Sequence, residues 1–167
     1  CTLSGYESSD DYGGEESNDV LSEGITPMPD DEAQRTNILQ AAYAISGTML
    51  EYGDAFSFND IVGPRTTGAG YVKALNGRGV KVVGGGVAQV ASVVWLAIED
   101  LDDVSIVEKS TYGKRYNQDY VDSSADAILT DYNAGTDFAF RYVGDDSITL
   151  YTYLDGDTLH CDVYANN

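Results

Sequence analysis

The chain is short of positive charge. Lys and Arg together number 9 against 28 Asp and Glu, which gives a net charge of −19 over 167 residues. Binding to nucleic acid, or to an anionic membrane surface by charge alone, depends on clustered Lys and Arg. The chain also lacks an apolar run of the roughly 20 residues that a membrane-spanning helix needs. We therefore expect neither a nucleic-acid partner nor a membrane-spanning segment.

Cysteine and histidine are also scarce. The chain has two cysteines, Cys1 and Cys161, and one histidine, His160. No two of them stand at the spacing of a zinc motif, so we expect no metal site built on cysteine. No phosphate-binding or dinucleotide-binding glycine motif is present either, and we expect no metal and no cofactor. Cys161 is expected to be a buried apolar residue, and His160 to point outward from the last strand.

The first 30 residues are rich in Ser, Gly, Asp and Glu and contain no Lys or Arg. This composition predicts a disordered acidic tether over residues 1–30, followed by one folded domain over residues 31–167. A chain that starts with Cys1 ahead of such a segment resembles a mature bacterial lipoprotein. The resemblance implies a lipid on Cys1 and a place on the extracellular face of a bacterial membrane; an arbitrary boundary is the alternative.

Two helices are predicted. Asp31 precedes Gln34 by three residues, as in a capping box, and apolar residues follow at helical spacing, so residues 31–46 are expected to form the first helix. Apolar residues at helical spacing also run from Val87 to Leu101. This second helix is apolar nearly all round and should lie in the core, ending near residues 99–100.

Most of the remaining sequence alternates between polar and apolar residues and predicts strands. Short strands are expected at residues 48–50, 56–59, 79–83, 104–108 and 127–130, with a tyrosine-rich loop over residues 110–122. Residues 138–143, 148–154 and 159–164 are expected to form an antiparallel meander. The predicted fold is α+β: two main helices packed on a mainly antiparallel β-sheet, with a C-terminal β-meander.

Several motifs cluster between residues 55 and 98. They are Phe56-Ser57-Phe58-Asn59, Gly63-Pro64-Arg65-Thr66, Gly70-Tyr71 and Gly84-Gly85-Gly86-Val87 with Gln89. Together they resemble the VanW-like family, named after an accessory gene product of some vancomycin-resistance clusters. The resemblance extends over about residues 34–145. It implies a protein of the bacterial envelope and carries no assigned biochemical activity.

Two positions depart from the family pattern. The family has Cys after Gly-Gly-Gly-Val, where this chain has Ala88, and a His-Ser pair in a later loop, where Tyr112 stands. A thiol at the first turn of a buried helix, with a His as base and an Asp such as Asp126 to orient it, would follow the logic of cysteine enzymes. Ala88 cannot be a nucleophile, so we expect no catalysis at this position. Because both the Cys and the His are absent, we favour a natural loss of any such activity over an engineered Ala88.

Ligand binding could persist without catalysis. The candidate residues are those of the glycine triple, the anion-binding start of the second helix and a nearby cation: Arg65, Gly84, Gly85, Gly86, Gln89 and Ser92. A cell-wall peptide or glycan carries groups that suit them, while close helix–sheet packing alone also explains the glycines. Two further functions stay open: a cell-wall (peptidoglycan-modifying) enzyme that uses residues other than position 88, and a structural surface domain.

Overall fold

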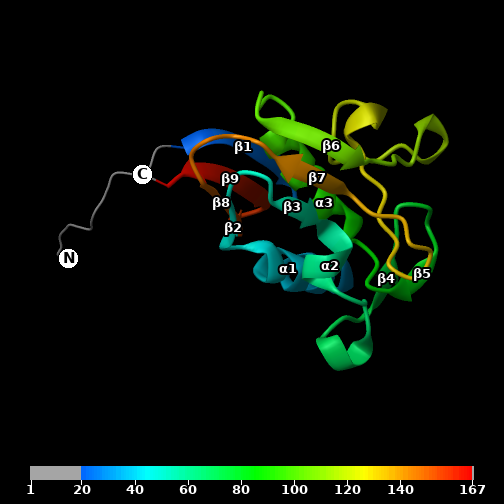
Figure 1. The fold of residues 1–167 in the computed structure, drawn as a ribbon. Helices are drawn as coiled ribbons and strands as arrows, with labels where there is room; N and C mark the ends of the chain where they lie inside the picture. The colour runs from blue at the N-terminus through cyan, green and yellow to red at the C-terminus, as the bar shows by residue number, and fades with distance from the viewer. Residues whose placement is uncertain (1–19, 167) are drawn as a thin grey trace.

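The computed structural model describes residues 20–166 of the chain. Residues 1–19 and 167 lie outside the described residues, and with them lie Cys1, its expected lipid and most of the expected tether. The described part has an α+β architecture, with helices packed against antiparallel sheets (Figure 1). The predicted fold class is confirmed.

The expected tether is wrong for residues 20–27, which form strand β1 (Val20–Pro27). β1 pairs antiparallel with β9 (Thr158–Ala165). Its Gly24 faces α3 (Ala88–Ile98) so closely that a Cβ on it would lie 2.3 Å from the carbonyl oxygen of Val93. The polar composition of this segment resembles that of a disordered one. However, Gly24 leaves room for α3, and the buried Thr26 accepts a hydrogen bond from Gln89 of that helix.

The largest sheet has the strand order β1-β9-β8-β2, where β8 is Ile148–Asp155 and β2 is Thr48–Leu50. The expected hairpin of the last two strands is confirmed, since β8 and β9 pair along their full length. The first strand of the expected meander, β7 (Ala139–Tyr142), lies instead in a second sheet. β2 occupies the place beside β8 that β7 would take in a meander, and β1 pairs with β9 on the other side. Local alternation predicts a strand but does not show which distant strand will pair with it.

The second sheet has the order β3-β7-β6, with β3 at Ala55–Ser57 and β6 at Val104–Glu108. A two-stranded sheet pairs β4 (Lys73–Leu75) with β5 (Lys81–Val83). The strand expected over residues 127–130 does not form. Within the described residues, that segment makes only an isolated bridge between Thr111 and Ile128.

Both expected helices are present. α1 (Glu32–Ile45) begins after Asp31, whose carboxylate accepts a hydrogen bond from the Gln34 backbone N–H at 2.9 Å. α3 packs against β1 and β9, and its Trp95 contacts Phe138 next to β7, so the helix lies between the two larger sheets (Figure 1). A short helix, α2 (Phe58–Val62), was not expected; Ser57 caps it by accepting from the Asp60 N–H.

One hydrophobic core joins these elements. Phe56 stacks on Phe140 with ring centroids 4.8 Å apart, and both rings are fully buried. Cys161 is a buried free cysteine, as expected, and burial raises the pKa of its thiol. Such a thiol behaves as an apolar core group and not as a nucleophile.

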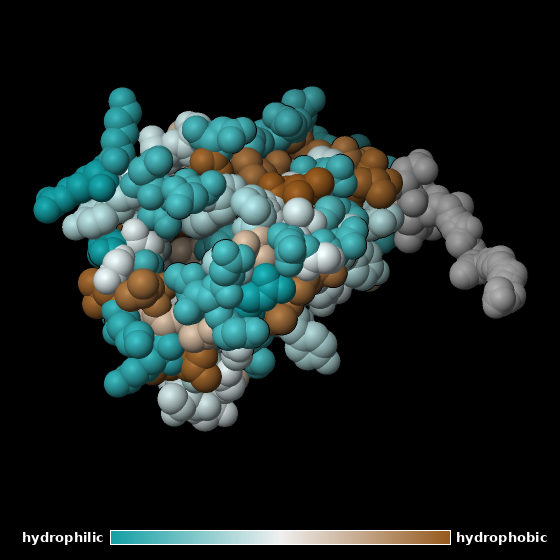
Figure 2. Space-filling view, turned by 180° about the vertical axis from the view of Figure 1, so that it is seen from behind, coloured by the Kyte–Doolittle hydropathy of each residue, from teal (hydrophilic) through white to brown (hydrophobic). Residues whose placement is uncertain are grey.

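The outer surface is mostly polar, with apolar side chains on the outward face of β1. Val20, Leu21 and Ile25 are each about half exposed, at 50%, 49% and 46%. Figure 2 shows brown apolar groups in a band that leads toward the grey terminus. Among residues 20–166, no helix has both the length and the apolar character needed to cross a membrane.

Candidate functional site

A groove crosses the start of α3. It consists of two adjoining pockets with volumes of about 260 and 250 Å³. Both pockets share four lining residues, Asn76, Gly86, Ala88 and Tyr112. The two positions at which this chain departs from the family pattern, Ala88 in place of Cys and Tyr112 in place of His, therefore both lie where the two pockets meet.

The glycine triple packs tightly between β4, α1 and Arg65. A Cβ on Gly85 would lie 2.0 Å from the Ala74 carbonyl oxygen, and a Cβ on Gly84 would lie 2.5 Å from the Arg65 Cβ. Gly84 and Gly86 also have φ of 91° and 101°, which residues other than glycine adopt at a cost. Close packing thus accounts for Gly84 and Gly85. Gly86 lines both pockets and Gly84 lines the second, whereas Gly85 lines neither.

Most backbone N–H groups at the N-terminus of α3 already donate to carbonyls of the preceding glycine turn and of Val87. The Val87 N–H donates to the Gly84 carbonyl at 3.1 Å, and the Gln89 N–H donates to the Gly86 carbonyl at 3.1 Å. The Val90 N–H donates to the Val87 carbonyl at 2.9 Å. Most of the first-turn donors expected to hold an anion are therefore already bonded.

Arg65 lies in the wall of the second pocket, but part of its guanidinium is held inside the protein. Its Nη1 donates to the Gly63 carbonyl at 2.7 Å and its Nη2 to the Asn59 side-chain oxygen at 2.9 Å. The guanidinium carbon also lies 5.4 Å from the Phe58 ring centroid and 5.9 Å from that of Tyr132. Burial lowers the pKa of Arg65, although the group stays charged at neutral pH.

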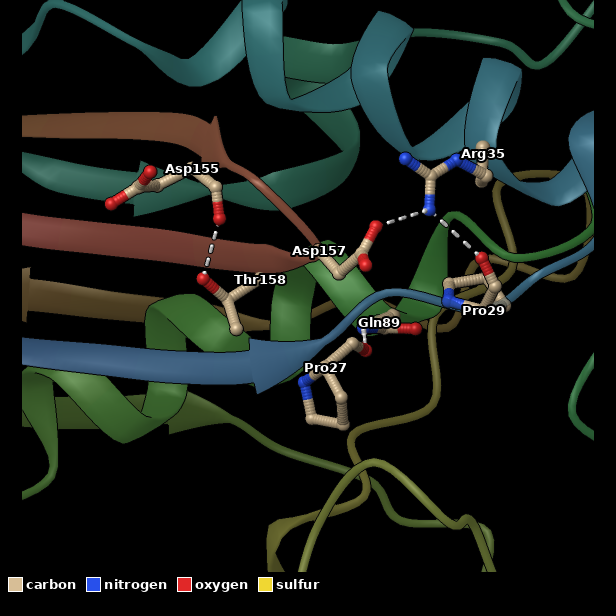
Figure 3. A network of polar contacts seen from close by, with 7 residues as sticks. All are labelled: Pro27, Pro29, Arg35, Gln89, Asp155, Asp157 and Thr158. Atoms are coloured by element: carbon tan, nitrogen blue, oxygen red, sulfur yellow. Dashed lines mark hydrogen bonds and ion pairs between the residues drawn. The ribbon is translucent and has the colours of Figure 1, made fainter.

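Gln89 binds the end of β1. Its Nε2 donates to the Pro27 carbonyl at 2.7 Å, as Figure 3 shows, and to the Thr26 hydroxyl at 2.9 Å. In the same view Arg35 of α1 donates to the Pro29 carbonyl at 3.1 Å. Gln89 lines the first pocket, yet both amide hydrogens are used in fixing β1, so only its oxygen is left for a ligand.

Ser92 does not reach the groove. It is fully buried, and its hydroxyl accepts from the Ile128 backbone N–H at 2.9 Å and lies 3.3 Å from the Tyr120 hydroxyl. Burial raises the pKa of Tyr120, so its phenol keeps the proton and can donate to Ser92. Ser92 therefore fastens the tyrosine-rich loop to α3, and through Tyr120 it shapes the first pocket.

We expect Ser92→Ala to lower the free energy of unfolding by about 1–3 kcal/mol, because the buried Ile128 N–H loses its acceptor. Urea denaturation measures this as a shift in midpoint at unchanged slope. Ser105→Ala, at an exposed position of β6, is the matched control and should change stability by less than about 0.5 kcal/mol. Equal stability of the two variants would show that the hydroxyl does not fasten the loop.

Tyr112 and Ala88 face the junction of the two pockets. Burial raises the pKa of Tyr112, against the opposing effects of a hydrogen bond with the Gly77 backbone and the charge of Arg78. Asp126, which would orient a base, instead accepts from the Trp95 indole N–H at 2.9 Å. The junction therefore presents a methyl group and a protonated phenol to a ligand.

The sequence analysis missed several groove residues. Arg78 is an exposed cation on the second pocket, and Gln34, Gln118 and Tyr120 line the first. Arg78 stands in Asn76-Gly77-Arg78-Gly79, which reads as a simple turn. Its turn-forming residues give no local sign that the tertiary fold places this cation in the same pocket as Arg65.

One hydroxyl–imidazole contact lies outside the groove. The Thr158 hydroxyl oxygen and His160 Nε2 are 2.8 Å apart, which is within reach for a nucleophile and its base. However, the Thr158 hydroxyl donates its single hydrogen to the Asp155 carbonyl at 2.8 Å. His160 therefore does not accept that proton, and the contact does not activate the hydroxyl.

Comparisons with known proteins agree with the motifs. A family model described as "VanW like protein" matches residues 33–164. The Bacillus subtilis (strain 168) protein named "Uncharacterized protein YoaR" is 33% identical over 132 residues, covering 70% of this chain and 42% of that protein. The chain thus spans less than half the length of this curated relative. No solved structure matches the chain.

Proposed function

The chain belongs to the VanW-like family, and we propose that it is a non-catalytic binding protein of the bacterial cell envelope whose groove holds a cell-wall peptide or glycan. The observation that carries the proposal is the junction of the two pockets at Ala88 and Tyr112. A ligand lying across the start of α3 would meet no thiol and no imidazole there. It would be bound with no thiol–imidazole pair next to it.

The lining chemistry supports a polar ligand with an anionic group. The first pocket offers one amide hydrogen of Gln34, whose other one donates to the Leu75 carbonyl, and the amide oxygen of Gln118, whose Nε2 donates to the Gly77 and Tyr116 carbonyls. With the hydroxyl oxygen of Tyr120, these groups suit the hydroxyl and amide groups of sugars and peptides. The second pocket offers Arg65 and Arg78, which suit a carboxylate. Cell-wall peptides linked to sugars carry both kinds of group.

Arg78 is the sharper test of this groove, because Arg65 also holds Gly63 and Asn59. We expect Arg78→Ala to weaken binding of a soluble muropeptide about tenfold, the loss of roughly one charge-assisted hydrogen bond. Isothermal titration calorimetry measures the dissociation constant. Arg115→Ala is the matched control, since both arginines lie over the Tyr116 ring, at 5.9 and 5.4 Å, but only Arg78 lines the groove.

The outcomes separate the three candidate functions. Equal weakening by Arg78→Ala and Arg115→Ala would contradict the groove as the binding site. Absence of binding to wild type would favour a structural surface domain. Cleavage or modification of the muropeptide during the titration, detected by mass spectrometry, would favour a peptidoglycan-modifying enzyme.

A location on the extracellular face of a bacterial membrane, through a lipid on Cys1, completes the proposal. The acidic, Ser- and Gly-rich sequence after Cys1 suits a spacer between a membrane and a folded domain. Incorporation of a labelled fatty acid into the wild-type chain and not into Cys1→Ala, in a bacterial host, is the expected result. Equal incorporation or none would contradict it.

A further inference from the structure

Three side chains with metal-binding groups meet on the outward face of the largest sheet. Glu23 of β1 lies directly opposite Asp162 of β9 in the strand register. His160 lies two residues before Asp162 on the same strand and therefore on the same face. One ligand atom from each of the three lies within 4.8 Å of the others. None of them lines the groove.

Hydrogen-bond directions place a hydrogen on Nε2 of the histidine ring. The Thr158 hydroxyl donates to the Asp155 carbonyl, a contact drawn in Figure 3, so it must accept from His160 Nε2–H. In a neutral imidazole with its hydrogen on Nε2, Nδ1 carries a lone pair. Nδ1 of the neutral ring is thus free to ligate a metal ion.

Two buried acceptors in this cluster are left unpaired. Within the part of the chain that the structure describes, neither His160 Nδ1 nor Asp162 Oδ1 has a hydrogen-bond partner, and both atoms are buried. Asp162 as a whole is only 6% exposed. A buried acceptor without a partner costs about 1–3 kcal/mol. A positive ion at this place would satisfy both acceptors together.

Tyr153 of β8 holds the two β9 ligands, His160 and Asp162, in position. Its hydroxyl donates to Asp162 Oδ2 at 2.7 Å, and its ring stacks on the His160 ring with centroids 5.0 Å apart. The hydrogen bond to Asp162, together with burial, raises the pKa of Tyr153, so the phenol remains a donor. An outer partner that orients a ligating carboxylate is typical of metal sites.

We propose that Glu23, His160 and Asp162 form a binding site for a divalent transition-metal ion of the zinc class. The metal has one imidazole nitrogen and two carboxylates as ligands, and a water molecule can take the fourth position. Ligands at about 2.1 Å in a tetrahedron are roughly 3.4 Å apart, so small side-chain rotations close the cluster. Glu23 is exposed and its side chain can make that adjustment.

The ligand set distinguishes zinc from the hard cations. Calcium and magnesium prefer six or more oxygen ligands, or a shell of waters around one or two carboxylates. An imidazole nitrogen suits zinc and its neighbours in the transition series. We therefore expect zinc to bind in competition with an excess of magnesium.

The single histidine of the chain makes a direct test possible. We expect stoichiometric zinc chloride, added to the metal-free full chain, to shift the imidazole nitrogen signals of His160 in an NMR spectrum. The shift should be largest at Nδ1, and magnesium chloride should not cause it. Carboxylates elsewhere in the chain can bind zinc weakly without moving these signals. Unchanged imidazole signals with excess zinc would overturn the proposal.

Variants test each ligand separately. Glu23→Gln and Asp162→Asn should each weaken the zinc-dependent shift at least about tenfold, and Tyr153→Phe by about tenfold as the loss of an orienting partner. Tyr52→Phe is the matched control, because Tyr52 is an exposed tyrosine in the turn that follows β2. Glu23→Gln leaves the fold intact, since the side chain is exposed. Unchanged zinc affinity in that variant would overturn the three-ligand site.

Discussion

Gly85→Ala is expected to destabilise the folded chain by about 3 kcal/mol or more, the upper range for inserting a methyl group into a filled core. A Cβ at this position would lie 2.0 Å from the Ala74 carbonyl oxygen and 2.5 Å from its carbonyl carbon. These are backbone atoms, and Ala74 is held by pairing with Val82 across β4 and β5. The clash cannot be relieved by rotating a side chain, so β4 and β5 would have to move away from α3.

Gly68→Ala is the matched control for this prediction. The nearest heavy atom to a Cβ on Gly68 is the Thr66 hydroxyl oxygen at 4.0 Å, and its φ is not in the left-handed region. We expect a change below about 0.5 kcal/mol. Urea denaturation followed by circular dichroism measures both variants. A Gly85→Ala chain as stable as Gly68→Ala would show that close packing is not the reason for glycine at position 85.

Asn37→Ala is expected to cost about 4 kcal/mol, because the Gly85 carbonyl and the Val72 N–H lose their partner at about 1–3 kcal/mol each and a small cavity adds to the loss. The Val72 carbonyl keeps the Gly84 N–H as a donor. Asn37 is fully buried in α1. Its Nδ2 donates to the carbonyls of Val72 and Gly85, both at 2.9 Å, and its Oδ1 accepts from the Val72 N–H at 2.9 Å. One side chain thus joins α1, the residue that precedes β4 and the glycine turn.

Gln40→Ala on the next turn of α1 is the control. Gln40 is exposed, and its Nε2 makes one hydrogen bond to the Ala69 carbonyl at 3.0 Å. Loss of one exposed hydrogen bond, offset by the higher helix propensity of alanine, should leave stability within about 0.5 kcal/mol. A loss of less than about 1 kcal/mol in Asn37→Ala would show that water replaces the amide.

Both predictions concern the base of the groove. If Gly85 and Asn37 set the distance between β4 and α3, their substitution should also weaken muropeptide binding in any fraction that stays folded. Arg78→Ala should weaken binding at unchanged stability. The pair of measurements therefore separates residues that build the groove from a residue that contacts the ligand.

Local patterns predicted the helices well. The cap at Asp31 and the apolar spacing of α1 and α3 depend on contacts within a few residues, and these form as expected. The β8-β9 hairpin also followed from alternation and a two-residue Asp-Gly turn signal. The short helix α2 was missed because Phe56 to Asn59 alternates like a strand, while the bonds that end β3 come from Asp137, far along the chain.

The residues of the candidate site were likewise predicted only in part. The glycine turn and Arg65 were found as motifs, but Gln89 and Ser92 hold β1 and Ile128 respectively. The groove residue Arg78 and the cluster around His160 carried no motif. His160, expected as a simple outward residue, faces Glu23 only because β1 pairs with β9.

The sequence by itself determined the family, the fold class, the two main helices and the replacement of a thiol by Ala88. All of these depend on residue identity or on spacing within one element. Only the tertiary structure decided that residues 20–27 form a strand, that the two pockets meet at Ala88 and Tyr112, and that Glu23 joins His160 and Asp162. Each of these is a contact between segments far apart in the chain, where pairing and burial select among partners that local patterns do not distinguish.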